Sequence, residues 1–119
     1  MTLRPLFAAL AVVALAGCAT DPAPNEQMRL TQQALEQASA VGASADESPE
    51  LKMAEAKFAR AQGSMADESY KNARMRAEQA ELDARLAEAK VLTLKGEEHL
   101  NVLNTRIERL RKQLRDDAQ

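Results

Sequence analysis

The chain has 119 residues, which allows one small domain at most. Its formal net charge is −2, so no excess of basic residues points to nucleic acid as a partner. Aromatic residues make up 3% of the chain, and such a sequence does not favour a β-sheet. Abundant Ala, Glu, Gln, Lys, Arg and Leu favour helix, so the composition predicts an all-α fold.

The first 17 residues are typical of a secretory signal peptide. Arg4 and the amino terminus supply positive charge, and the apolar run from Leu6 to Leu15 is shorter than the roughly 20 residues that span a bilayer. The only cysteine, Cys18, follows this segment. The sequence Leu15-Ala16-Gly17-Cys18 resembles the lipobox of bacterial lipoproteins, in which leucine, a small residue and glycine or alanine precede the cysteine.

This resemblance implies that the Cys18 sulfur receives a diacylglyceryl group, that cleavage follows Gly17, and that the new amino group is acylated, for example with palmitate. One acyl chain anchors a protein only marginally, whereas two or three anchor it durably. In lipoproteins an aspartate after the cysteine favours the inner membrane. Here Ala19 stands there, which implies the periplasmic face of the outer membrane. The alternative is a buried or reactive thiol in an ordinary exported protein.

Residues 18–25 contain two prolines and predict a flexible tether between the lipid and a helical domain at 26–119. The first helix is expected at about 26–41, with Asn25 as its N-cap and Gly42 ending it in the left-handed conformation. One face of this helix carries apolar or small residues at steps of three and four, namely Met28, Thr31, Leu35 and Ala38.

The second helix is expected at about 49–63. Ser48 is suited to the N-cap, and Pro49 fits the first helical position. Its apolar face is Leu51, Ala54, Phe58, Ala61 and Met65. Gly63-Ser64 is expected to end it. A third helix is then expected at about 67–115, capped by Asp67 or Ser64.

Two apolar seams run along the third helix. The alanine seam consists of Ala73, Ala77, Ala80, Ala84, Ala87, Val91 and Leu94, and we expect it to contact the first two helices. The leucine seam consists of Leu82, Leu86, Ala89, Thr93, Gly96, Leu100, Leu103, Ile107, Leu110 and Leu114, at alternating steps of four and three. Such sustained spacing is a coiled-coil pattern. The predicted architecture is a short antiparallel helical hairpin packed on one long, coiled-coil-like C-terminal helix.

The lengths of the helices do not match. The first two, at about 16 residues, reach roughly 24 Å, whereas an unbroken third helix of about 48 residues reaches roughly 70 Å. The most apolar part of the leucine seam lies beyond this cover, and five exposed residues of this kind form an unusual patch. We therefore expect a partner to bind Leu100, Leu103, Ile107, Leu110 and Leu114.

The partner is either a second copy or a different, acidic helix. With Leu100 and Ile107 at heptad position a, Arg106 falls at g and Arg111 at e, so parallel self-pairing places these arginines together. Antiparallel self-pairing also tends to bring arginines close, which favours an acidic partner, whereas burial of the leucines favours a homo-oligomer. A third alternative is a break at Gly96 that folds the last segment back into a four-helix bundle. The unbroken register across Gly96 argues for continuity.

The sequence presents no catalytic constellation, metal-ligand set or cofactor motif. His99 has no cysteine or suitably spaced carboxylate near it, so it is expected to be a solvated helix residue. One charge cluster is a candidate for contact with an anionic polymer, a lipid headgroup or an acidic protein. It consists of Arg109, Arg111, Lys112 and Arg115. The alternative is a solvated face that complements the negative end of the helix dipole.

The helical region resembles a bacterial lipoprotein family whose domain has no known function and sometimes precedes an OmpA-like peptidoglycan-binding domain. The resemblance rests on residues within 27–90: Ala34, Ala38, Gly42-Ala43, Pro49-Glu50-Leu51, Ala54, Lys57-Phe58, Ala61, Tyr70, Ala73, Ala77-Glu78-Gln79-Ala80, Asp83-Ala84 and Ala87. Members typically carry an aromatic-Ala pair before the proline, where this chain has Glu47-Ser48, and no OmpA-like domain is present here. The resemblance implies an envelope lipoprotein and no particular activity.

The expected function is therefore that of a non-enzymatic helical interaction or scaffold module of the cell envelope. The alternative is a structural spacer that binds peptidoglycan non-covalently through the basic C-terminal helix. The murein lipoprotein, a spacer of this kind, ends in a lysine joined to peptidoglycan. This sequence ends in Asp116-Asp117-Ala118-Gln119, which weakens that comparison.

Overall fold

The computed structural model describes residues 21–118 and contains three helices in that range. They are α2 (Asn25–Ala40), α3 (Pro49–Ala66) and α4 (Tyr70–Asp117), and no strand occurs between residues 21 and 118. The predicted all-α architecture is confirmed. The signal peptide, Cys18 and Ala19 lie outside the described residues.

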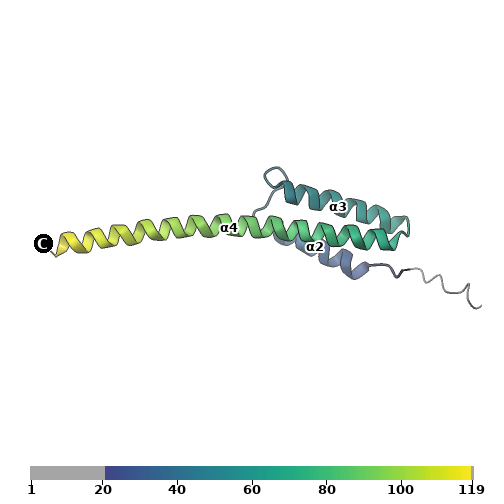
Figure 1. The fold of residues 1–119 in the computed structure, drawn as a ribbon, viewed down its shortest axis with the longest axis horizontal. Helices are drawn as coiled ribbons and strands as arrows, with labels where there is room; N and C mark the ends of the chain where they lie inside the picture. Colours follow the sequence, from purple (N-terminus) through teal and green to yellow (C-terminus); the bar gives the residue numbers. More distant parts are fainter. Residues whose placement is uncertain (1–20, 119) are drawn as a thin grey trace, which may run out of the picture.

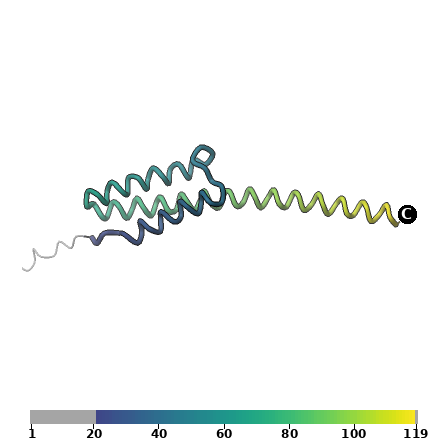
Figure 2. The backbone as a smooth tube through the Cα atoms, turned by 180° about the vertical axis from the view of Figure 1, so that it is seen from behind, coloured from purple at the N-terminus to yellow at the C-terminus, as the bar shows by residue number. Residues whose placement is uncertain are grey.

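Both shorter helices lie along the first part of α4, and the rest of α4 extends away from them alone (Figure 1). The view from behind shows the same arrangement (Figure 2). Polar contacts give the directions. Gln27 of α2 donates a hydrogen bond to Glu81 of α4. Lys95 of α4 donates to the carbonyl of Val41, the C-cap of α2, so α2 runs parallel to α4. The ion pairs Lys57–Asp83 and Lys90–Glu50 show that α3 is antiparallel to it.

The alanine seam of α4 forms the centre of the core. Its first five residues are completely buried, namely Ala73, Ala77, Ala80, Ala84 and Ala87. They face Ala34 and Ala38 of α2 and Leu51, Ala54, Phe58 and Ala61 of α3, which are also buried. Small side chains let the helix backbones approach closely. The expectation that this seam contacts the first two helices is confirmed for these five residues.

The end of the alanine seam departs from the expectation. Val91 is half-buried and Leu94 is 65% exposed, because α2 ends at Ala40 and the chain then crosses to the start of α3. The turn is a Schellman motif, in which the Ala43 N–H donates to the Ala38 carbonyl and the Gly42 N–H donates to Ser39. Gly42 has a φ of +99°, so the glycine ends α2 in the left-handed region as expected.

The start of α3 follows the sequence pattern. Ser48 is the N-cap, and its hydroxyl accepts a hydrogen bond of 3.2 Å from the Leu51 N–H. The predicted end at Gly63-Ser64 is wrong, since α3 continues to Ala66. Ser64 is buried and accepts a hydrogen bond of 3.2 Å from the Arg76 guanidinium, so packing against α4 continues through the glycine.

The caps of the other two helices were also predicted wrongly. Pro24, not Asn25, precedes α2, and Ser69, not Asp67 or Ser64, precedes α4, in both cases without a side-chain capping bond. The turn before α4 is a second Schellman motif, in which Ser69 donates to Ser64 and Glu68 donates to Met65. Its left-handed position is occupied by Glu68, with a φ of +56°.

The long helix does not break at Gly96. The α-helix α4 runs from Tyr70 to Asp117 over 48 residues, so the continuity expected from the register is confirmed and the four-helix alternative is excluded. In the described part of the chain, no helix is both long and apolar enough to cross a membrane.

Candidate interaction surface on α4

The five residues predicted to meet a partner are all exposed. Their exposed fractions are 60% for Leu100, 51% for Leu103, 44% for Ile107, 57% for Leu110 and 70% for Leu114. Neither α2 nor α3 reaches this part of α4 (Figure 1). The mismatch in helix length therefore leaves this apolar stripe uncovered within residues 21–118.

The exposed surface extends further toward the N-terminus of α4 than we expected. Leu82 is 67% exposed and Leu86 is 48% exposed, although both lie in the half of α4 that carries α2 and α3. Ala89, Thr93 and Gly96 between the two groups are exposed as well. These residues belong to the leucine seam, of which only the last five residues were predicted to bind a partner.

The leucine seam lies on the opposite side of α4 from the buried alanines. At 100° per residue, Leu82 and Leu86 are each turned about 160° from Ala84 around the helix axis. Between Leu82 and Leu114 the seam spans about 48 Å at 1.5 Å per residue. One line of exposed, mostly apolar residues therefore runs along both halves of α4.

The four candidate anion-binding residues lie on the bare part of α4. Arg109, Arg111, Lys112 and Arg115 line a shallow, open surface together with Thr105 and Glu108. All four are exposed, and none of them makes an ion pair with another described residue. The arrangement is a positively charged face without a cavity.

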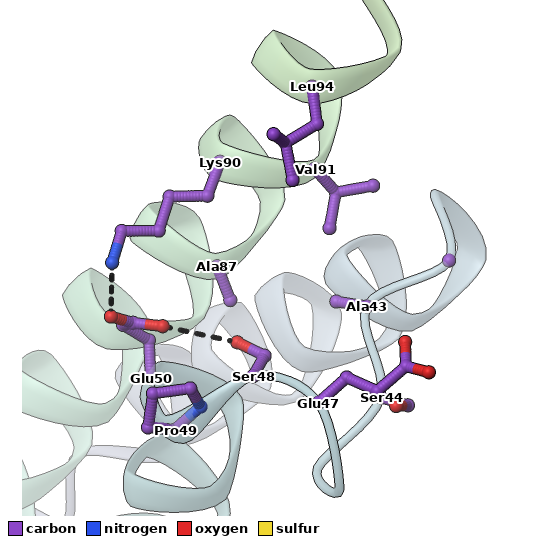
Figure 3. Close-up of a pocket in the computed structure, with 11 residues that line it drawn as sticks. Ala43, Ser44, Glu47, Ser48, Pro49, Glu50, Ala87, Lys90, Val91 and Leu94 are labelled. Atoms are coloured by element: carbon purple, nitrogen blue, oxygen red, sulfur yellow. Dashed lines mark hydrogen bonds and ion pairs between the residues drawn. The ribbon is translucent and has the colours of Figure 1, made fainter.

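A small pocket lies where the turn after α2 meets α4 (Figure 3). Its apolar lining includes Ala43, Ala87, Val91 and Leu94. At its edge Lys90 donates to Glu50, and this hydrogen bond lowers the pKa of the Glu50 carboxyl below its ordinary value. Ser48 donates a second hydrogen bond to Glu50 at this edge, so these polar groups bond to each other.

Groups that could hold a metal ion are absent from residues 21–118, where no three His, Cys, Asp or Glu side chains gather. His99 is exposed on α4. The geometry of the described chain is thus that of an all-helical protein with an extended helix and an uncovered apolar face.

The chain belongs to the family described as Domain of unknown function (DUF4398), whose pattern matches residues 26–103. The matched region includes α2 from Glu26 onward, α3 and the part of α4 up to Leu103. The four basic residues lie beyond it.

The fold is similar to a crystal structure of a DUF4398 family protein from Pseudomonas aeruginosa. The two sequences are 64% identical, the similarity covers 78% of this chain and 96% of that chain, and the TM-score is 0.75. None of the curated proteins compared with this chain matches it.

Proposed function

We propose that the protein is a lipid-anchored, non-enzymatic interaction module at the periplasmic face of the bacterial outer membrane. In this proposal the lipid on Cys18 holds the chain at the membrane, and the leucine seam of α4 binds another helix. The exposure of the seam carries the proposal, because burying a leucine contributes about 1.5–3 kcal/mol. Several neighbouring leucines therefore provide a substantial driving force for association.

The anchor is supported by the Leu15-Ala16-Gly17-Cys18 sequence and by the position of Cys18 just before the helical domain. Cells expressing the protein should incorporate labelled palmitate into it, and the protein should fractionate with the outer membrane. Cys18→Ser should abolish both, because serine lacks the thiol that accepts the lipid. Membrane fractionation of Cys18→Ser identical to that of the wild type would contradict a lipid anchor.

The docking role can be tested with a photo-crosslinking amino acid at Ile107 in the full-length protein in intact cells. We expect a discrete covalent adduct, because Ile107 lies in the leucine seam. The same amino acid at Thr105, two residues away and off the seam, is the matched control and should give little adduct. Equal adducts at both positions, or none at Ile107, would argue against docking through the seam.

A second candidate function is that of a spacer which binds peptidoglycan through the basic face of α4. The exposed, unpaired Arg109, Arg111, Lys112 and Arg115 support it. Changing all four to glutamine should release the protein from isolated sacculi. Neutralising four exposed basic residues elsewhere, Lys52, Arg60, Lys71 and Arg74, provides the control. If the first variant binds sacculi as well as the control does, the spacer function is wrong.

A further inference from the structure

The leucine seam has its midpoint near Glu98, and this position separates two unlike halves of α4. The half before it lies beside α2 and α3, while the half after it extends alone (Figure 2). The buried alanines place α2 and α3 on the side of α4 opposite the seam. We propose that the seam binds a second copy of this chain, antiparallel, about a two-fold axis level with Glu98. This proposal rests on the proposed function and names its partner.

The antiparallel arrangement covers the whole seam. Each bare half would lie against the exposed Leu82 and Leu86 of the other copy, so each end of the dimer becomes a bundle of α2, α3, α4 and the second α4. A two-fold pair of this kind is closed, because the same surface is used by both chains. It therefore leaves no seam open for further copies.

Side-chain sizes complement each other in this register. The positions that fall level across the axis pair large residues with small ones, namely Leu100 with Gly96, Leu103 with Thr93 and Ile107 with Ala89. The outer positions pair leucine with leucine, namely Leu110 with Leu86 and Leu114 with Leu82. A parallel, in-register pair would instead stack Ala89, Thr93 and Gly96 on their own copies. Three successive layers made only of small side chains leave voids between the helices, whereas layers that pair a large side chain with a small one fill the space.

The charge distribution favours the same direction. Residues 99–115 carry five Lys and Arg against one Glu and are flanked by the acidic pairs Glu97-Glu98 and Asp116-Asp117, whereas residues 21–96 carry thirteen Asp and Glu against ten Lys and Arg. An antiparallel pair places each basic segment beside the acidic region of the other copy. A parallel pair places the two basic segments together.

The positions that flank the seam also discriminate between the two directions. In the parallel pair, g faces e, and three like-charged contacts arise: Glu78–Asp83, Arg85–Lys90 and Arg106–Arg111. Asp83, Arg85 and Lys90 are ion-paired within each chain, so the contact between Arg106 and Arg111 carries most of the repulsion. In the antiparallel pair, e faces e and g faces g. Arg111 then approaches Asp83 of the other copy, and the only like-charged contact among these flanking positions is Glu97 with its own copy. This register keeps apart the arginines that repel each other in the parallel pair, contrary to the expectation that antiparallel pairing also brings arginines close.

The arrangement is compatible with two lipid anchors in one membrane. The start of α2 lies beside Arg74 and Glu78 of α4, so the two tethers would leave the dimer roughly 65 Å apart. The two-fold axis is perpendicular to the plane of the paired α4 helices, so it keeps both copies of α2 on the same side of that plane. The dimer would therefore lie along the membrane surface.

Disulfide crosslinking of the full-length protein in cells tests the proposal, because the bacterial periplasm is oxidising. Leu86→Cys combined with Leu110→Cys in one chain should give a disulfide-linked dimer on non-reducing gels, since these positions face each other only between antiparallel copies. Within one helix they are about 36 Å apart and cannot bond. Each single variant should give no more disulfide-linked dimer than the wild-type chain gives. The wild-type chain serves as the control for any dimer formed through Cys18.

The pair Arg74→Cys and Thr105→Cys, both exposed on α4 but off the seam, is the matched control and should give no dimer. Dimers from each single variant would show parallel pairing and overturn the antiparallel proposal. Absence of any dimer, together with an Ile107 adduct to a different protein, would overturn self-pairing and leave the docking function intact. Absence of both the dimer and the Ile107 adduct would overturn both proposals.

Discussion

At the residue scale, alanine determines how this protein packs. The five buried alanines of α4 lie against further alanines of α2 and α3, and the largest fully buried side chains between residues 21 and 118 are Leu51 and Thr31. Such a core has little spare volume, because closely packed interiors contain few voids. The structure is therefore sensitive to any increase in side-chain size on this seam.

Ala84→Leu should destabilise the protein by about 1–3 kcal/mol, because its added atoms have no space between α4 and the neighbouring helices. Urea unfolding followed by circular dichroism measures this change. Ala59→Leu, on the exposed face of α3, is the control and should change the stability by less than about 0.5 kcal/mol. Equal stability of the two variants would show that the alanine seam is not tightly packed.

Glu81 links α2 to α4 in a charge-dependent way. It accepts a hydrogen bond of 2.7 Å from Gln27 and is paired with Arg85, and these contacts lower its pKa below the ordinary value of 4.5. Because the pKa is lower in the folded state, the carboxylate stabilises the fold above about pH 4.5, and this contribution is lost as the pH falls further.

Glu81→Gln should therefore lose stability less steeply than the wild type below about pH 4.5. The urea midpoint measured at a series of pH values gives this slope. Gln27→Ala, which removes the hydrogen bond that lowers the Glu81 pKa most, should reduce the slope in the same direction. An unchanged slope in both variants would contradict the role assigned to this contact.

At the scale of the elements, the turn between α2 and α3 and the turn between α3 and α4 have the same hydrogen-bond pattern but different residues at the left-handed position. Both are Schellman motifs that require a residue with positive φ, and the first uses Gly42 whereas the second uses Glu68. Positive φ is unfavourable for residues with a side chain, so glycine is suited to the first turn and glutamate is strained in the second.

Gly42→Ala should destabilise the protein by about 1 kcal/mol, and Glu68→Gly should stabilise it by a similar amount. A Cβ at Gly42 would meet the Lys95 Nζ at 3.6 Å, an ordinary contact, so the cost arises from the backbone. Thermal unfolding of both variants measures the changes. Gly63→Ala, in an open helical position, is the control and should be stabilising. The assignment of the two turns is wrong if both variants shift the midpoint in the same direction.

At the scale of the whole molecule, the buried core and the candidate interaction surface occupy different parts of α4. In the described part of the chain, every buried residue lies between Pro24 and Ala87, whereas all residues from Leu92 to Ala118 are exposed. The second part of α4 therefore contributes little to the stability of a single copy.

Removal of residues 98–119 should leave a helical domain that still unfolds cooperatively, because its buried residues all remain. The circular dichroism signal should fall by the contribution of about 20 helical residues, and seam-dependent association should be lost. Loss of the cooperative transition would show that the end of α4 is required for the fold of one chain.

The sequence by itself determined the all-α class, the N-cap at Ser48, the glycine turn at Gly42 and the two seams of α4. These are local or periodic properties, and side-chain chemistry and spacing specify them directly. The end of α3 was missed because burial of Ser64 against α4 outweighs the local tendency of Gly63 to stop a helix. The use of Glu68 at a positive φ has no sequence signal of its own.

Only the tertiary structure decided which apolar residues are covered. The two seams look alike as patterns, but α2 and α3 are short and both pack on the alanine side of α4, since alanines allow the closest approach. Leu82 and Leu86 consequently stay exposed beside a folded core. Exposure depends on where neighbouring helices end and on which side they lie, and a periodic pattern within one helix contains neither of these facts.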